Sequence, residues 1–327
     1  MAAACHTRGM DDDDLLLWLA GGLGAAALVA GAILYARKNG MLQTLPGLAS
    51  LAASAARTDA TQVVLPDLAS AAFPGVSPGA AVVVPRGFSP SDPLHVIVYF
   101  HGWNNCCANV VANQDGTCHV GGPRRNASHL VAQMEAAGSR AILVVPELQP
   151  EVESGAAGKL GQAGGLKALL DELLSGVLVP LFGVARDSTA IRRLSIQTHS
   201  GGYAAAAAAI RNGGVSSILR EVVLHDSLYG NVDVFNGWVR DHAAGFGVPG
   251  LDGFRFANVY TDGGGTRANA RAQAQQLADL GLAGAMADLV SGAELASVPA
   301  AITFKRTGYS HVEMTRHYPG LWFAPVG

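Results

Sequence analysis

Residue types used in nucleophilic catalysis follow several apolar, β-branched runs of the sequence at the points where predicted strands end. They are His101-Gly102-Trp103 after "HVIVYF", Ser200 after "LSIQTH", Asp226 after "EVVLH", Asp262 after "NVYT", and His311 a few residues after "AITFK". A serine, two carboxylates and a histidine therefore arrive in the chain order nucleophile, acid, base. A serine hydroxyl is a weak nucleophile at neutral pH and needs a nearby base and donors for the oxyanion. This pattern favours acyl transfer through a serine.

Ser200 lies in "LSIQTHSGGYAAAAAAI", between a strand-like run and an alanine-rich run. Gly201 and Gly202 permit a sharp turn, because a side chain there would press on the backbone or on a neighbouring strand. The six alanines after Tyr203 are good helix formers. The stretch therefore has the strand–turn–helix context of a nucleophile elbow. The alternative is a serine that caps an ordinary helix N-terminus.

The elements that must position these residues alternate along the chain. Predicted strands are "AAVVVP", "HVIVYF", "AILVVP", "LSIQT", "EVVLH", "FANVY" and "AITFK", and predicted helices are Ala127–Ala137, Gly165–Val184, Gly202–Asn212, Val232–Ala243 and Arg267–Leu280. Such alternation predicts an α/β fold with a mostly parallel, doubly wound sheet and helices on both faces. In such a sheet the ligand crevice lies at the carboxyl ends of the strands.

The region from Pro78 to Gly327 resembles the α/β-hydrolases, with "THSGG" in place of the family's usual G-x-S-x-G. Thr198 stands where the family has its first glycine. In that family a His-Gly pair after an early strand opens the oxyanion loop. The resemblance therefore implies that the N–H of Trp103 or a neighbour joins that of Gly201, and that Gly102 lets the backbone approach the substrate.

The resemblance also implies the base and the acid. His311, in "KRTGYSHVEM", lies in the loop after the last strand, which is the usual place of the family histidine. Asp226 and Asp262 both end strands, and the family has its acid at either place. Because the glycines after Asp262 are a strong turn signal, we expect Asp226 as the acid, with Asp262 as the alternative.

The N-terminal part predicts a membrane anchor. Leu15–Ala36 contains 22 residues without a charge, which as a helix would cross the roughly 30 Å hydrocarbon core. The expected organisation is an acidic tail (1–14), a single transmembrane helix (15–36), an Ala/Ser/Pro-rich tether (37–77) and the hydrolase domain (78–327). A cleaved signal peptide or a buried helix are the alternatives.

Two features bear on the side of the membrane, and they disagree. Arg37 and Lys38 follow the predicted span whereas only Arg8 precedes it, so the count of basic residues favours a cytoplasmic hydrolase domain. One of the vicinal cysteines, Cys106 or Cys107, could instead bridge to Cys118, which would favour an oxidising compartment. Reduced thiols packed in a loop remain the alternative.

The composition narrows the function classes. Half of the residues are hydrophobic, the net charge is −3, and no cluster of Lys and Arg is longer than two residues, so a nucleic-acid partner is excluded. We predict a membrane-anchored serine hydrolase that cleaves an ester or amide of a small-molecule or acyl substrate, without metal or organic cofactor. The alternatives are an acyltransferase with the same residues and a non-catalytic binding or scaffold protein with a hydrolase fold.

Overall fold

The computed structural model describes residues 58–325, except for 74, 150–155, 264, 283–285, 290–294, 296 and 299. The predicted acidic tail, the predicted transmembrane helix Leu15–Ala36 and the first part of the predicted tether lie outside the described residues. Within the described part, no helix is both long enough and apolar enough to span a bilayer.

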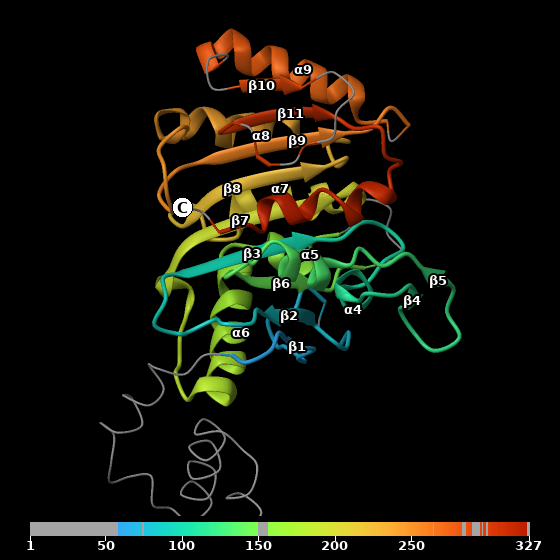
Figure 1. Cartoon of the computed structure of the whole chain (residues 1–327), viewed down its shortest axis with the longest axis vertical. Helices are drawn as coiled ribbons and strands as arrows, with labels where there is room; N and C mark the ends of the chain where they lie inside the picture. The colour runs from blue at the N-terminus through green and yellow to red at the C-terminus, as the bar shows by residue number, and fades with distance from the viewer. Residues whose placement is uncertain are drawn as a thin grey trace, which may run out of the picture. The chain divides into compact units, whose positions relative to one another are not determined.

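In the described part of the chain, nine strands form one sheet (Figure 1). From edge to edge they are β1 (Gln62–Val64), β2 (Ala80–Val84), β6 (Ile142–Pro146), β3 (Leu94–Phe100), β7 (Ile191–His199), β8 (Leu219–His225), β9 (Arg255–Tyr260), β11 (Ile302–Arg306) and β10 (Met286–Leu289). β2 runs antiparallel to both of its neighbours, and the other neighbouring pairs are parallel. The sheet is therefore mixed, with the mostly parallel character that the sequence predicts.

Helices cover both faces of the sheet (Figure 1). They are α4 (Cys107–Val111), α5 (Leu130–Ala136), α6 (Gly165–Phe182), α7 (Tyr203–Asn212), α8 (Val232–Asp241) and α9 (Arg267–Leu277). α4 and α5 share a buried cluster with β2, β3 and β6, and Trp322 near the C-terminus packs on β8 and β9. α6, α7 and α8 cover the opposite face. Because both faces are covered, β2, β3 and β6 are buried along their whole length and read as continuous apolar runs.

The described part of the predicted tether differs from the expectation. β1 pairs antiparallel with β2 and so belongs to the sheet. The Glu172 carboxylate on α6 accepts hydrogen bonds from the backbone N–H groups of Ala69 and Ser70 at 2.9 and 2.8 Å. The segment from Thr58 onward is therefore part of the folded domain. A strand of three residues is too short to give a period-2 signal, and Pro66, two residues after its end, is typical of a loop.

A small hairpin lies beside α4. β4 (Gly116–Thr117) and β5 (Arg124–Arg125) pair antiparallel in a separate two-stranded sheet. The hairpin follows α4, which itself comes after the loop at the end of β3 where the sequence places the oxyanion residues.

Candidate active site

Ser200 lies in a tight turn between β7 and α7. Its φ is +51°, in the left-handed region that is costly for residues other than glycine. A Cβ on Gly202 would lie 2.5 Å from the carbonyl oxygen of Phe100 and 2.8 Å from that of His101. Only glycine fits there, because the chain leaving β3 passes directly against the turn. The strand, the strained serine and the helix together form the strand–turn–helix arrangement that the sequence predicts at this place.

Thr198, which departs from the family motif, is built into this turn. Its side chain is fully buried, and its hydroxyl lies 3.1 Å from the hydroxyl of Ser227. The Ser227 hydroxyl in turn donates to the carbonyl oxygen of Ser200 at 2.8 Å. The threonine therefore does not crowd the elbow, and it forms part of a hydrogen-bonded chain that holds the Ser200 backbone.

Three of the predicted residues meet at the carboxyl ends of the strands. The Nε2 atom of His311 lies 2.8 Å from the Ser200 hydroxyl oxygen, and its Nδ1 atom lies 2.7 Å from a carboxylate oxygen of Asp226. Ser200 follows β7, Asp226 follows β8, and His311 comes from the loop after β11. Both distances are those of hydrogen bonds, so the geometry is the one that Ser-His-Asp triads require.

Asp226 is fully buried and accepts several hydrogen bonds besides that from His311. The N–H and the hydroxyl of Thr261 donate to it at 3.1 and 2.5 Å, and the hydroxyl of Thr266 also donates. Burial by itself raises the pKa of this carboxyl, but the hydrogen bonds from His311, Thr261 and Thr266 outweigh it and lower the pKa to about 2. The carboxylate therefore stays ionised at neutral pH.

Asp262, the alternative acid, lies elsewhere. Its carboxylate pairs with the guanidinium groups of Arg306 and, at 3.1 Å, Arg267. The hydrogen bond from Arg306 lowers the pKa of Asp262. In the structure Asp262 belongs to an exposed ion-pair cluster at the end of β9, whereas Nδ1 of His311 contacts Asp226.

The oxyanion candidates lie against the elbow. A Cβ on Gly102 would lie 2.8 Å from the Cβ of Ser200 and 3.1 Å from Nδ1 of His199, so the backbone at 102 passes in contact with the serine. The His101 ring accepts the N–H of Leu148 at Nε2 (3.1 Å) and lies with Nδ1 3.0 Å from the carbonyl oxygen of Gly102. His101 therefore orients the peptide that joins Gly102 to Trp103.

His199 makes a contact that no sequence pattern predicted. Its ring centroid lies 4.6 Å from that of His311, and its Nε2 atom is 2.9 Å from the carbonyl oxygen of His311. Burial, followed by the neighbouring His311 ring, lowers the pKa of His199 to about 3. At neutral pH the ring is uncharged, and because a carbonyl oxygen can only accept, its one N–H is on Nε2. This N–H donates to the His311 carbonyl and holds the loop that carries His311.

Ser200 opens into a cavity of about 300 Å³. Its wall includes His199, His311, Gly102 and Trp103 on the side of the elbow. The Trp103 side chain is 47% exposed, so it lies at the rim of the cavity and is not part of the hydrophobic core. Beyond the rim the wall continues over Asn104 and Asn105, which precede α4, and over Arg124 and Arg125 of β5.

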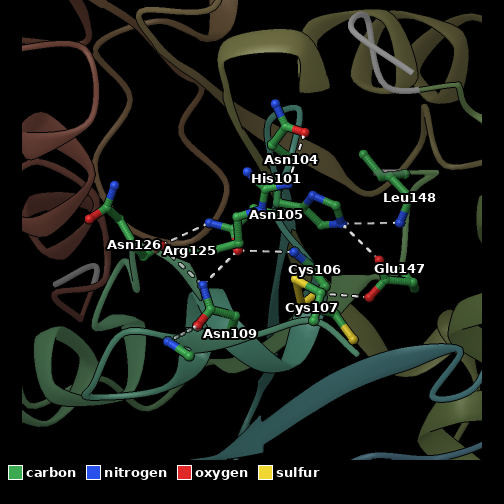
Figure 2. Close-up of a disulfide and its surroundings, with 12 residues drawn as sticks. His101, Asn104, Asn105, Cys106, Cys107, Asn109, Arg125, Asn126, Glu147 and Leu148 are labelled. Carbon is green, nitrogen blue, oxygen red and sulfur yellow. Dashed lines mark hydrogen bonds and ion pairs between the residues drawn. A yellow bond between two sulfur atoms is a disulfide. The ribbon is translucent and has the colours of Figure 1, made fainter. Parts of the chain in front are cut away.

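A disulfide joins Cys106 to Cys118 beside this cavity, and Figure 2 shows its surroundings. Of the two partners that the sequence leaves open for Cys118, the bridge takes Cys106. Cys107 is free and buried, and its N–H donates to the Glu147 carboxylate at 2.8 Å. Within the described residues, no group of three or more His, Cys, Asp or Glu side chains is arranged to hold a metal ion.

The strand order, the helices on both faces and the serine on a strand–helix turn define an α/β-hydrolase fold. The structure is similar to that of a feruloyl esterase module from Clostridium thermocellum in complex with sinapinate, with a TM-score of 0.50 and 13% identity over 81% of this chain and 87% of that one. A hormone-sensitive lipase from a metagenome library aligns over 97% of this chain and 99% of that one, with a TM-score of 0.36 and 12% identity. At 13% identity the likeness to the feruloyl esterase module is one of fold alone. No protein-family model matches the chain, and no curated protein matches it in sequence.

Proposed function

We propose that the protein is a serine hydrolase that cleaves an ester through an acyl-enzyme on Ser200. The observation that carries this proposal is the unbroken hydrogen-bonded line from the Ser200 hydroxyl through His311 to the ionised Asp226. The site combines a buried carboxylate of low pKa with an imidazole that contacts a serine in a strained backbone conformation. Such constellations concentrate at active sites.

The reaction follows from this geometry. His311 Nε2 takes the hydroxyl proton as Ser200 Oγ attacks the ester carbonyl, and Asp226 stabilises the imidazolium that forms. Collapse of the tetrahedral intermediate breaks the bond to the alcohol, which leaves with the proton from His311. Water then attacks the acyl-enzyme with His311 as base, releases the acid and restores the Ser200 hydroxyl.

We assign the oxyanion to the N–H groups of Gly201 and Trp103. His101 accepts at Nε2, so its Nδ1 carries the hydrogen and donates to the Gly102 carbonyl. The C=O and N–H of a trans peptide point in opposite directions, so the N–H of Trp103 points away from the His101 ring. Within the described part of the chain, this N–H has no hydrogen-bond partner. It is therefore available for a developing negative charge.

A fluorophosphonate probe tests the proposal on the full chain in detergent. The probe should label the protein, and the Ser200→Ala variant should show no labelling. Hydrolysis of a 4-nitrophenyl ester should be lost in the same variant. Normal labelling of Ser200→Ala would contradict the assignment, and a folded wild-type chain that never reacts would favour a non-catalytic protein with a hydrolase fold.

Product analysis separates hydrolysis from the acyltransferase alternative. A hydrolase releases one free acid for each alcohol at every concentration of added acceptor. A transferase releases less free acid as an acceptor alcohol or amine is added, because the acyl group leaves Ser200 for the acceptor.

We further propose that Leu15–Ala36 anchors the protein in a membrane, with the disulfide Cys106–Cys118 favouring an oxidising compartment for the hydrolase domain. The count of basic residues around the predicted span favours the opposite side. Carbonate washing should leave the full chain in the membrane fraction, whereas a chain shortened to begin at Thr58 should be released. Alkylation of the chain in intact cells decides the side, because an oxidised pair leaves Cys106 and Cys118 unmodified.

A further inference from the structure

The cavity at Ser200 carries positive charge without a matching negative one. Arg124 and Arg125 of β5 both line it, and none of its lining residues is an aspartate or a glutamate. Asp226 lies behind His311 and is fully buried. The remaining wall also includes the uncharged polar residues Asn104, Asn105 and Asn126.

Neither arginine is neutralised within the described part of the chain. The Arg125 guanidinium donates a 3.3 Å hydrogen bond to the side-chain oxygen of Asn104, which carries no charge. The hydrogen bond from the Ala127 N–H, and after it the charges of Arg316 and Arg124, lower the pKa of Asp115, and this carboxylate is already bound by Arg316 at 2.8 Å. Other described arginines do pair with carboxylates, as Arg211 does with Asp233 at 2.8 Å.

The strand that carries the two arginines is fixed in place. The carbonyl of Asn126, directly after β5, accepts from the side-chain amides of Asn105 at 2.9 Å and Asn109 at 3.1 Å. These asparagines flank the disulfide, as Figure 2 shows. The Ala127 N–H donates to Asp115 at 2.9 Å, and the Cys106–Cys118 bridge closes the loop from the other end. The hydrogen bonds at Asn126 and Ala127, together with the pairing of β5 with β4, thus anchor the backbone of Arg125 next to the cavity.

We propose that the substrate of Ser200 is an ester that also carries a carboxylate or a phosphate, and that Arg125, assisted by Arg124, binds this anion. The inference rests on the proposed hydrolase function and names its substrate class. A guanidinium presents planar paired donors that match both carboxylate and phosphate oxygens. A cavity of about 300 Å³ is at the small end of ligand sites, so the part of the substrate that it encloses is short.

Two esters of equal size test the charge. They are the 4-nitrophenyl monoester of glutaric acid, which carries a carboxylate, and the 4-nitrophenyl ester of glutaramic acid, which carries an uncharged amide instead. For the wild type we expect kcat/KM to be at least about tenfold higher for the carboxylate, and we expect this ratio to shrink as salt rises from 50 to 500 mM. The 4-nitrophenyl ester of 4-phosphonobutanoic acid carries a phosphonate in place of the carboxylate and stands in for a phosphate. The anionic ester that reacts faster shows whether the natural substrate carries a carboxylate or a phosphate.

Variants locate the recognition. Arg125→Gln should bring the ratio between the charged and the uncharged ester to about one, and Arg125→Lys should restore part of it. Arg271→Gln is the matched control, because Arg271 is exposed on α9 and does not line the cavity; it should leave the ratio unchanged. An uncharged ester that reacts as fast as both anionic esters would overturn the inference, as would a preference that survives in the double variant Arg124→Gln, Arg125→Gln.

A binding measurement separates this inference from the proposed function. Glutarate should bind the Ser200→Ala protein in calorimetry and should fail to bind when Arg125→Gln is added. Labelling of Ser200 by the fluorophosphonate without any binding of glutarate or phosphate would keep the hydrolase and remove the anion site. Binding of glutarate by a wild-type chain that resists the probe would remove the hydrolase function and, with it, the assignment of the anion as part of a substrate.

Discussion

The imidazole of His199 lies against that of His311, with ring centroids 4.6 Å apart, and its Nε2 is 2.9 Å from the His311 carbonyl oxygen. The residue before the proposed nucleophile thus holds the loop that carries the proposed base. Because the acceptor is a carbonyl oxygen, Nε2 carries the hydrogen and donates it, and burial keeps the pKa of His199 near 3, so the ring stays neutral over the whole neutral pH range. His199 is therefore a positioning residue for His311.

Replacing His199 with phenylalanine keeps a ring at this place and removes the donor. A hydrogen bond of this kind is worth about 1 kcal/mol, so we expect kcat for a 4-nitrophenyl ester to fall about fivefold with little change in KM. His199→Gln, which retains an amide donor, should recover part of the loss. Equal losses in the two variants, or a loss confined to KM, would contradict the positioning role.

The acid of the site is tested by a matched pair of variants. Asp226→Asn should lower kcat by a factor on the order of 10⁴, because His311 loses its orienting carboxylate and takes the wrong tautomer. Asp262→Asn removes a carboxylate that pairs with Arg306 and Arg267 at the surface, so kcat should stay within about twofold of the wild type. The reverse ranking would reassign the acid to Asp262.

The preference for Asp226 over Asp262 shows what the sequence can predict about such a site. Turn chemistry alone separated the two, because glycines follow Asp262 whereas Ser227 and Leu228 follow Asp226. Strand ends are readable from apolar runs, and parallel strands bring their carboxyl ends together, so the contact of Ser200, Asp226 and His311 follows from order along the chain. The bounds of α6 and α7 differ from the predicted helices by two residues or fewer.

The parts that the sequence did not predict depend on contacts between distant segments. Thr261 and Thr266 lower the pKa of Asp226, yet each looks like an ordinary loop residue in the sequence. Ser227 supports Ser200 only because β7 and β8 lie side by side. The antiparallel pairing of β2 likewise has no local signal, since a buried strand gives the same apolar run in either direction.

Because the turn at Ser200 is tight, we expect that reaction at Ser200 does not tolerate one methyl group added at position 202. A Cβ at position 202 would meet backbone oxygens at 2.5 and 2.8 Å, and backbone cannot move aside as a side chain can. Gly202→Ala should therefore abolish fluorophosphonate labelling of Ser200, even if the protein still folds. Gly176→Ala is the control, because a Cβ there, on α6, has no atom within 4 Å; it should keep labelling intact. Normal labelling of Gly202→Ala would show that the turn is not tight.

Thr198 gives a finer test of the same turn. Thr198→Ser keeps the hydroxyl that lies 3.1 Å from Ser227, whereas Thr198→Val keeps the volume and loses the hydrogen bond. We expect Thr198→Val to lower the free energy of unfolding by about 1 to 3 kcal/mol, since a buried hydroxyl loses its partner, and Thr198→Ser to cost less. Urea unfolding monitored by circular dichroism measures both. A Thr198→Val protein as stable as the wild type would remove the supporting role.

Three buried histidines should make the free energy of unfolding depend on pH. Burial lowers the pKa of His95, His199 and His225 to about 3, against about 6.5 in the unfolded chain. As pH falls below 6.5 the unfolded chain binds protons that the folded chain does not, so the free energy of unfolding decreases. By pH 5 each histidine should have cost about 2 kcal/mol. Urea midpoints at pH 7.5 and 5 measure the effect, and His225→Gln should shrink the difference by about a third. Equal midpoints at the two pH values would contradict the three low pKa values.

The disulfide should make the free energy of unfolding depend on redox conditions. The Cys106–Cys118 bridge closes a loop with a sequence separation of 12, and removing the cross-link from a loop of this size costs about 3 kcal/mol through the entropy gained by the unfolded chain. We therefore expect the double variant Cys106→Ser, Cys118→Ser to unfold at a lower urea concentration by the equivalent of about 3 kcal/mol. Dithiothreitol should have the same effect on the wild type and none on the double variant.

Cys107 is the internal control, because its thiol is free and buried. Burial raises the pKa of this thiol, so little thiolate forms that could exchange with the bridge and replace Cys106 or Cys118. A wild-type midpoint that does not respond to dithiothreitol, with reduction of the bridge verified by alkylation and mass spectrometry, would show that the hairpin is held without the cross-link.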